Sequence, residues 1–160
     1  MASPGFPRSV ATMKFEIRNA TINDASDISE LSKQLGYSTS EADVIERLRA
    51  ILNSDDHIVY VAFLPNGKTI AWIHVCTAQR VESGSFAEIV GFVVSEAFRR
   101  KGIGRKLLEA VENWTVQKKL PKLRARSKIE REDAKEFFLN MGFSVSKQQR
   151  VFDKRMNSGN

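Results

Sequence analysis

The stretch that decides the fold reads AEIVGFVVSEAFRRKGIGR and covers residues 87–105. Its first half belongs to a mostly apolar run over 86–94, which predicts a long buried strand. A basic loop with two glycines follows, and a helix with a regular apolar stripe is expected over 102–119. Gly91, in the middle of the strand, indicates a bulge or the close approach of another backbone or a ligand.

Hydrophobic periods on both sides of this stretch predict the remaining elements. Before it, the pattern indicates a strand at 14–18, a helix at 25–35, a helix that starts at 38–40 and ends at 52, and a hairpin of strands at 58–64 and 69–77. After it, the pattern indicates a strand at 123–126, a helix at 132–141 and one or two strands at 143–156. This order is typical of one mixed α/β sheet.

The composition indicates one globular domain. The chain has 160 residues, of which 42% are hydrophobic and 28% are charged, and two separate cores would each be too small to bury enough apolar surface. We expect the domain to occupy residues 13–160. Residues 1–12, which contain two prolines, a glycine and no hydrophobic period, are expected to form a disordered extension.

Several classes of protein are excluded by the residues present. The longest uncharged apolar stretch, 89–94, is far shorter than the roughly 20 residues of a membrane span. Cys76 is the single cysteine, and His57 and His74 are the only histidines, so neither a disulfide nor a metal site is expected. No pattern of a secretory signal is present, so we expect a cytoplasmic protein.

The positive charge is concentrated in one part of the chain. The net charge is +6, and residues 99–131 carry twelve basic and three acidic residues, so this segment has a charge of +9 and the remainder a charge of −3. Such a basic segment fits an anionic cofactor, a nucleic acid or an anionic membrane. The basic run after 117 has few interleaved aromatic residues, so nucleic-acid binding is the less favoured of these hypotheses.

The glycine loop has the chemistry of a pyrophosphate site. Glycines two positions apart at a helix start let main-chain N–H groups approach a ligand closely, and the helix dipole favours an anion there. Five basic residues bracket the loop: Arg99, Arg100, Lys101, Arg105 and Lys106. The loop matches neither G-x-x-x-x-G-K-[ST] nor G-x-G-x-x-G. The alternative is a simple strand-to-helix turn under a solvated basic surface.

Three motifs together resemble the GNAT superfamily of acetyl-CoA-dependent N-acetyltransferases. They are R-x-x-G-x-G at 99–104, AKEFFLNMGF at 134–143 and IRNATINDA at 17–25. The resemblance covers about residues 14–156. It implies the GNAT fold, a single mixed, mostly antiparallel sheet flanked by helices, and the transfer of an acetyl group from acetyl-CoA to an amine.

The resemblance also implies where acetyl-CoA binds. The main chain of Phe92, Val93 and Val94 would pair with the pantetheine arm, and the N–H of Val93 or Val94 would polarise the acetyl carbonyl. The pyrophosphate would be held by the segment of Arg99, Arg100, Lys101, Gly102, Ile103, Gly104 and Arg105. The local charge of +9 then has a reason, because the cofactor carries several phosphate charges. Phe138 would also contact the cofactor, at a position where the family commonly has a tyrosine that can protonate the leaving sulfur.

Glu88 is the candidate catalytic base. An ammonium group must lose a proton before it can attack, and many members of the resembled family carry a glutamate near this position. Strict strand alternation places Glu88 on one face with Val90 and Phe92. The alternative is a solvated carboxylate or one that pairs with Arg80.

Two further residues are candidates for the acceptor pocket. Tyr37 follows Gly36 in the loop between the first two helices, where a plain loop aromatic is the alternative. His74 lies between Trp72 and Cys76 on one face of a strand, and it would line the pocket, share the base role or simply belong to the core.

The sequence therefore predicts an N-acetyltransferase that moves acetyl directly to a primary amine in a ternary complex. A small-molecule acceptor is expected because the chain has no docking appendages. Because residue 138 is a phenylalanine, a CoA-binding regulatory module with little turnover is one alternative. A basic nucleic-acid-binding domain is a second alternative. Whether the chain forms a homodimer stays open.

Overall fold

The computed structural model describes residues 13–157 in two compact units, and the chain passes from the first to the second between Arg126 and Ser127. The expected extension at 1–12 lies outside the described residues. No helix of the described chain is long and apolar enough to cross a membrane. The two units are described separately below.

The first unit is built on one five-stranded sheet in the order β1-β2-β3-β4-β5. Its strands are β1 (Glu16–Asn19), β2 (His57–Phe63), β3 (Thr69–Arg80), β4 (Gly84–Val94) and β5 (Leu123–Ala125). The first four pair antiparallel, and β5 runs parallel to β4. This confirms the single mixed, mostly antiparallel sheet.

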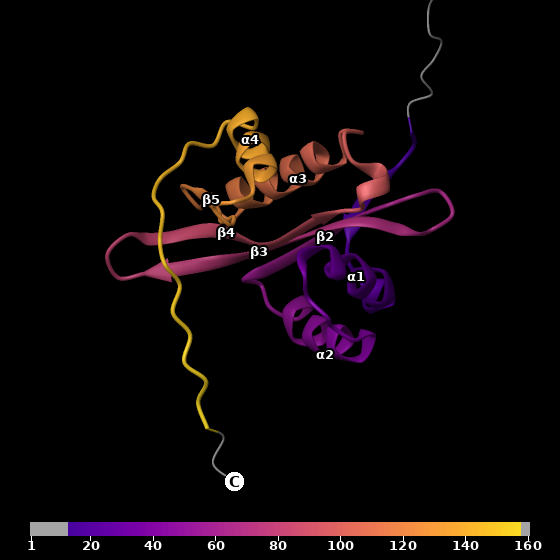
Figure 1. Ribbon diagram of the computed structural model, residues 1–160, viewed down its shortest axis with the longest axis horizontal. Coiled ribbons are helices and arrows are strands. Elements are labelled where there is room, and N and C mark those ends of the chain that lie inside the picture. Colours follow the sequence, from indigo (N-terminus) through magenta and orange to yellow (C-terminus); the bar gives the residue numbers. More distant parts are fainter. Residues whose placement is uncertain (1–12, 158–160) are drawn as a thin grey trace, which may run out of the picture. The chain divides into compact units, whose positions relative to one another are not determined.

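Helices cover both faces of this sheet (Figure 1). The helices α1 (Ala25–Ser32) and α2 (Glu41–Leu52) lie on one face, and α3 (Ile103–Gln117) lies on the other. Short 3-10 turns are η1 (Ile22–Asp24), η2 (Lys33–Leu35) and η3 (Glu96–Phe98). The α1/α2 side buries a core that includes Val59 and Val61 of β2, and α3 buries a stripe of apolar side chains at helical spacing.

The hairpin of β3 and β4 is longer than its hydrophobic pattern predicts. The pattern predicts that the first strand ends at 77 and the second begins at 86, but β3 continues to Arg80 and β4 begins at Gly84. The polar residues at this end still pair, since the cross-strand partners run to Gln79 with Ser85 and Arg80 with Gly84. The residues that extend the hairpin at this end include charged ones, such as Arg80.

The second unit contains α4 (Glu132–Asn140) and no strand in its described residues, so the prediction of one or two strands at 143–156 is wrong. Its apolar residues Val145, Val151 and Phe152 are 61%, 80% and 85% exposed. A strand needs the main chain of a neighbouring strand to satisfy its N–H and C=O groups. The described part of this unit offers only a helix, so an alternating pattern alone does not make a strand here.

A buried carboxylate joins β1, η1 and β3 in the first unit. Asp24 is 4% exposed, and its two oxygens accept hydrogen bonds from the Arg18 guanidinium at 2.8 and 2.9 Å. The Thr21 N–H and the Thr69 hydroxyl each donate to it at 2.8 Å. Burial raises the pKa of the Asp24 carboxyl, but these hydrogen bonds outweigh burial and hold the pKa below its usual value.

Asp24→Asn should lower the free energy of unfolding by about 2 kcal/mol, because the buried carboxylate then loses the charge that strengthens its hydrogen bonds from Arg18, Thr21 and Thr69. A lowered carboxyl pKa stabilises the fold above the unfolded value of 3.8, and that stabilisation is lost as the pH falls through the lower folded value. Urea unfolding at several pH values measures both effects. Glu30→Gln is the control, because its pair with Lys33 is exposed, and it should change stability by less than about 0.5 kcal/mol. Equal effects of the two substitutions would contradict this account.

Candidate active site

The strands β4 and β5 stop pairing halfway along β4. The residues of β5 pair only with Ala87, Glu88 and Ile89. From Val90 to Val94, no strand of the described chain pairs with this side of β4. This leaves an open strand edge, to which an extended ligand with amide groups can add as a strand does.

A bulge in β4 begins where the strands part. His74 lies opposite Gly91, but the next residue, Val75, lies opposite Ile89, so Val90 is an extra residue on β4. At Gly91 a Cβ atom would lie 2.5 Å from two ring carbons of Trp72. The bulge that Gly91 predicts is therefore confirmed. The group that approaches Gly91 closely is the Trp72 side chain and not another backbone.

The bulge changes which side chains share a face with Glu88. Residues directly opposite in an antiparallel pair point to the same face, and Glu88 lies opposite Cys76, whereas Phe92 lies opposite Ile73. Since Cys76 and Ile73 are on different faces of β3, the prediction that Glu88 shares a face with Phe92 is wrong. Strict alternation fails because Val90 is inserted between them. Glu88 instead lies on the same face as Gly91, next to the open edge.

The main-chain groups of the open edge follow from the ladder between β3 and β4. The Ser95 N–H donates to the Ile70 carbonyl at 2.9 Å. Because bonded pairs alternate along an antiparallel ladder, Val93 is bonded to β3, and the peptide groups of Phe92 and Val94 point to the opposite side. Of the two N–H donors considered for the acetyl carbonyl, only that of Val94 faces the open edge, and it lies six positions from Glu88, about 20 Å along an extended strand. The Phe92 N–H faces the same edge two positions nearer to Glu88.

Gln34 closes the end of this edge, and sequence analysis did not identify it. Its side-chain Nε2 donates to the Val94 carbonyl at 3.0 Å, and its Oε1 accepts from the Glu96 N–H at 3.2 Å. The Arg99 Nε donates to the same Val94 carbonyl at 3.4 Å. No local pattern around an exposed glutamine in η2 indicates a partner 60 residues away.

The loop before α3 has the geometry of an anion site. Gly102 is the N-cap residue with φ +83°, and Arg100 also has a positive φ of 62°. No side chain of the described chain caps α3, and the first main-chain bond of the helix runs from Lys106 to Gly102. The N–H groups of Ile103, Gly104 and Arg105 are therefore available to a ligand.

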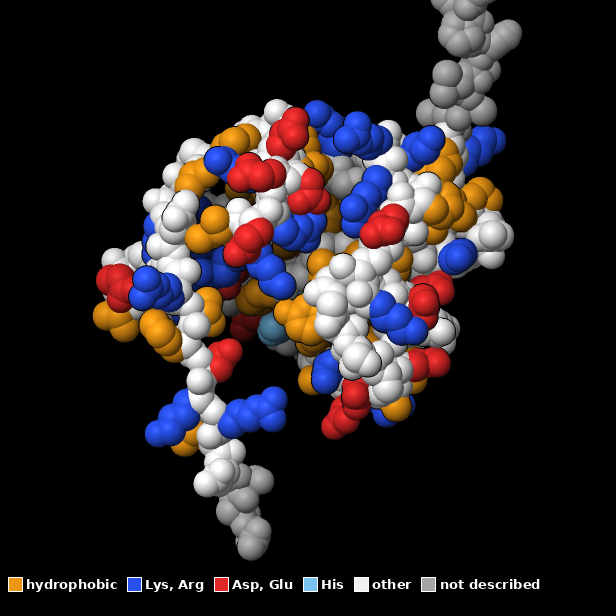
Figure 2. Space-filling view, viewed as in Figure 1, with side chains coloured by type: hydrophobic (Ala, Val, Ile, Leu, Met, Phe, Trp, Pro, Cys, Tyr) orange, Lys and Arg blue, Asp and Glu red, His pale blue; other side chains and the backbone are white. Residues whose placement is uncertain are grey.

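Basic side chains surround these N–H groups, and Lys and Arg gather over the loop and the start of α3 (Figure 2). Arg100, Lys101 and Arg105 are exposed. Arg99 bonds to the end of β4, as described above, and Lys106 pairs with Glu109 at 3.4 Å. A helix N-terminus with free donors and exposed cations fits the pyrophosphate of acetyl-CoA.

Glu88 is buried and paired, which decides between the alternatives left open for it. It is 9% exposed, and the Arg126 Nε donates to its Oε2 at 3.0 Å. The partner is thus Arg126 and not Arg80. Four residues lie side by side across four strands on this face: His57, Cys76, Glu88 and Arg124. Burial and the nearby Glu88 raise the pKa of the Cys76 thiol, so it stays protonated at neutral pH.

The two histidines form a pair on the same face. The His57 Nδ1 and the His74 Nε2 lie 2.9 Å apart. Burial, and then the neighbouring His57, lower the pKa of His74 to about 4, so His74 is neutral at pH 7. One ring nitrogen therefore donates and the other accepts. His57 was missed as a site residue because its partner lies on another strand, 17 positions away.

The other two candidates are Tyr37 and Phe138. Tyr37 is 64% exposed in the loop that follows η2. Phe138 belongs to α4 in the second unit, where its ring contacts Phe143 edge to face at a centroid distance of 5.1 Å. The role of each stays a prediction.

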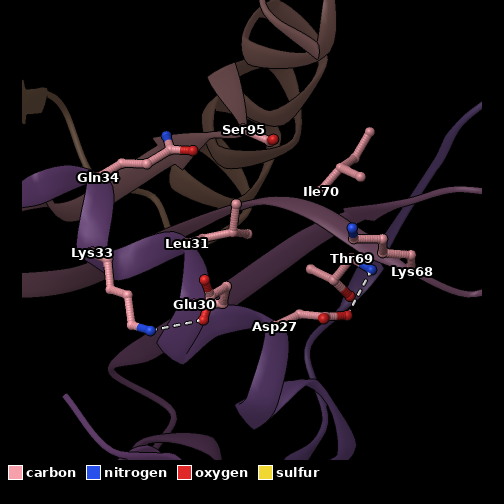
Figure 3. A pocket seen from close by; sticks show the side chains of 9 residues that line it. All are labelled: Asp27, Glu30, Leu31, Lys33, Gln34, Lys68, Thr69, Ile70 and Ser95. Atoms are coloured by element: carbon pink, nitrogen blue, oxygen red, sulfur yellow. Dashed lines mark hydrogen bonds and ion pairs between the residues drawn. The ribbon is translucent and has the colours of Figure 1, made fainter. Parts of the chain in front are cut away.

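A cavity of about 340 Å³ lies beside Gln34 (Figure 3). Its charged groups are already partnered in part, since Asp27 accepts from the Thr69 N–H at 3.0 Å and Glu30 pairs with Lys33 at 3.0 Å. Its lining residues are Asp27, Glu30, Leu31, Lys33, Gln34, Lys68, Thr69, Ile70 and Ser95. None of the predicted site residues lines it.

Comparison with known proteins identifies the family. The chain matches the model described as the acetyltransferase (GNAT) family over residues 22–143. The chain belongs to this family and is an acetyl-CoA-dependent N-acetyltransferase. It is 30% identical over 118 residues to an aminoglycoside N(6')-acetyltransferase type 1 from Stenotrophomonas maltophilia, which covers 71% of this chain and 76% of the relative.

Solved structures share the fold at lower identity. An aminoglycoside antibiotic 6'-N-acetyltransferase from Acinetobacter baumannii superposes with a TM-score of 0.78 at 18% identity, over 90% of this chain and 100% of the other. A glucosamine-6-phosphate N-acetyltransferase from Arabidopsis thaliana superposes with a TM-score of 0.77 at 24% identity, over 88% and 98%. At these identities the two structures support the fold alone.

Gly91→Ala should destabilise the protein by about 1–3 kcal/mol, because the new Cβ would force the Trp72 ring to move. Trp72→Leu removes the ring, so the double variant should be more stable than the sum of the two single changes predicts. A double-mutant cycle measured by urea unfolding gives this coupling. Strict additivity would show that the ring and Gly91 do not constrain each other.

Gly104→Val should weaken acetyl-CoA binding more than tenfold, because its side chain would block the approach of the pyrophosphate to the N–H groups of α3. Valine is a better helix former than glycine, so the fold should not lose stability. Calorimetry measures the affinity, and thermal unfolding is the control. Unchanged affinity in a folded variant would remove the pyrophosphate assignment.

Proposed function

We propose that this enzyme transfers an acetyl group from acetyl-CoA directly to the primary amine of a small molecule bound beside it in a ternary complex. The observation that carries the proposal is the position of Glu88, which lies on the strand that opens at Val90 and on the same face as Gly91. The similarity to an aminoglycoside acetyltransferase supports a small-molecule acceptor.

The first part of the mechanism is the placing of the donor. The loop and the start of α3 bind the pyrophosphate, and the open edge at Phe92 and Val94 pairs with the pantetheine arm. When bound, acetyl-CoA supplies an acetyl group activated as a thioester. The Phe92 N–H, which faces the open edge four positions from Glu88, donates to the acetyl oxygen as negative charge develops there.

The second part is deprotonation of the amine. The Glu88 carboxylate takes a proton from the ammonium group, directly or through one water, and the neutral nitrogen then attacks the acetyl carbon. The new C–N bond forms as the C–S bond breaks, and the electron pair leaves on sulfur. The nitrogen then loses its second proton to the thiolate or to solvent, which gives the neutral amide. Arg126 keeps Glu88 in position through its 3.0 Å bond. A thiol has an ordinary pKa near 8.5, so the thiolate can leave without a hydroxyl at residue 138.

The histidine pair is the second candidate for the proton acceptor. His57 and His74 lie on the same face as Glu88, and His74 is neutral at pH 7. The low pKa of His74 disfavours a proton on its ring, so in this alternative the His57 ring accepts the proton from the amine. This arrangement would replace Glu88 as the base without changing the donor site.

Glu88→Gln should lower kcat by roughly 100-fold or more, while the affinity for acetyl-CoA stays within about twofold, because the carboxylate acts on the amine alone. Glutamine can still accept from Arg126, so the fold should be kept. The rate should recover in part at high pH, where the amine loses its proton unaided. Steady-state kinetics on amine acceptors between pH 6 and 10 measure this.

His57→Gln is the matched variant on the same face. If Glu88→Gln leaves kcat unchanged and His57→Gln lowers it, the base belongs to the histidine pair. If neither changes kcat, deprotonation by a side chain of this face is excluded.

A further inference from the structure

A cluster of positive charge surrounds one buried aromatic ring in the first unit. Phe86 of β4 is 0% exposed. The Arg80 guanidinium lies 5.7 Å from the centre of its ring, the Lys122 ammonium 4.7 Å and the Arg124 guanidinium 4.5 Å. Three cationic groups that come from β3, β5 and the residue before β5 therefore converge on one place.

This charge is not neutralised within the described chain. Arg80, Lys122 and Arg124 make no ion pair with any described residue, and the acid next to them, Glu88, bonds to Arg126. Arg80 and Lys122 are exposed, and Arg124 is half-buried. A guanidinium that stacks on a ring keeps its edge N–H donors, and these donors match the oxygens of a carboxylate or a phosphate.

The phosphates of acetyl-CoA do not account for this cluster. Phe86 and Val94 are eight positions apart on β4, which is about 26 Å along an extended strand. The length of α3 gives the same result. Its 15 residues span about 22 Å, with the pyrophosphate loop before the first residue and Lys122 after the last. Lys122 and Arg124 thus lie too far from the pyrophosphate loop to bind the phosphates held there.

The cluster adjoins the carboxylate assigned to the amine. Arg124 lies directly opposite Glu88, and Phe86 is two positions before Glu88 on the same face of β4. The order along β4 is thus the ring with its cations, then Glu88, then the open edge. A molecule whose amine meets Glu88 and that extends along β4 away from the open edge therefore reaches Arg80, Lys122 and Arg124.

We propose that the acceptor is an amine that carries a negatively charged group, a carboxylate or a phosphate ester, and that Arg80, Lys122 and Arg124 bind this group. The inference rests on the proposed function, since it names the class of acceptor for the same site. The cluster would repel a polycation, so an acceptor of that kind is expected to be a poor substrate.

The test compares acceptors that differ only in the anionic group. Glucosamine with glucosamine 6-phosphate tests the phosphate, pentylamine with 5-aminopentanoate tests the carboxylate, and kanamycin represents a polycation. The anionic member of at least one pair should have a kcat/KM at least tenfold higher than its neutral partner, and kanamycin should be the poorer acceptor. The pair that shows the preference identifies the anion. Equal values within both pairs, or a preference for kanamycin, would overturn the inference and leave the acetyltransferase proposal intact.

Variants of the cluster show where the preference arises. Arg80→Gln and Lys122→Gln should each reduce the preference for the anionic member at least fivefold, and the neutral member and the KM for acetyl-CoA should change less than twofold. Lys118→Gln is the matched control, because Lys118 stacks on Trp114 at 5.8 Å outside the site. A preference that survives both cluster variants would contradict the assignment.

A binding measurement keeps the two proposals separate. If no amine of the panel is acetylated, the proposed function fails, and calorimetry with glucose 6-phosphate against glucose then tests the cluster alone. Binding of the phosphate that weakens in Arg80→Gln and Lys122→Gln would support the anion site, and absent or unaltered binding would overturn it. Binding of a DNA duplex that is lost in the same variants, with no preference among the amines, would assign the cluster to nucleic acid and overturn the inference.

Discussion

The active site depends on the way β4 leaves β5 after Ile89. One extra residue, Val90, breaks the ladder between β3 and β4, and the Trp72 ring occupies the space where a side chain at position 91 would stand. The irregularity turns Glu88 to the face of Gly91. Because β5 ends at Ala125, opposite Ile89, no described strand pairs with the edge of β4 beyond this point, and this edge is the one that the pantetheine arm would use.

The electrostatics of the site follow from the length of β4 and of α3. Both elements run between the pyrophosphate loop and the cations around Phe86, so one segment of sequence supplies two separate positive regions. The first faces the phosphates of the donor. The second lies beyond Glu88, where only the acceptor can reach it. Charges this far apart are largely screened from each other at physiological salt, so each region selects its own ligand.

Local sequence patterns predicted the parts of the site that are formed by neighbours in the chain. The strand, the glycine loop and the start of α3 are visible because hydrophobic period and glycine chemistry act over a few residues, and Gly91 marked the bulge. The bond from Arg126 to Glu88, the pair of His57 and His74 and the two bonds of Gln34 join residues that are 17 to 62 positions apart. They depend on strand register and on the bulge, which no local pattern specifies.

Gln34 shows how such a distant contact limits the site. Its amide forms hydrogen bonds with the Val94 carbonyl and the Glu96 N–H. These are the next main-chain groups on this side of β4 that an added strand would use. The open edge therefore ends at the Val94 N–H, at the end of β4 that leads into the pyrophosphate loop. Because the same side chain belongs to η2, the loop that carries Tyr37 starts from a point fixed on the donor strand. One amide thus joins the end of the donor strand to the start of that loop.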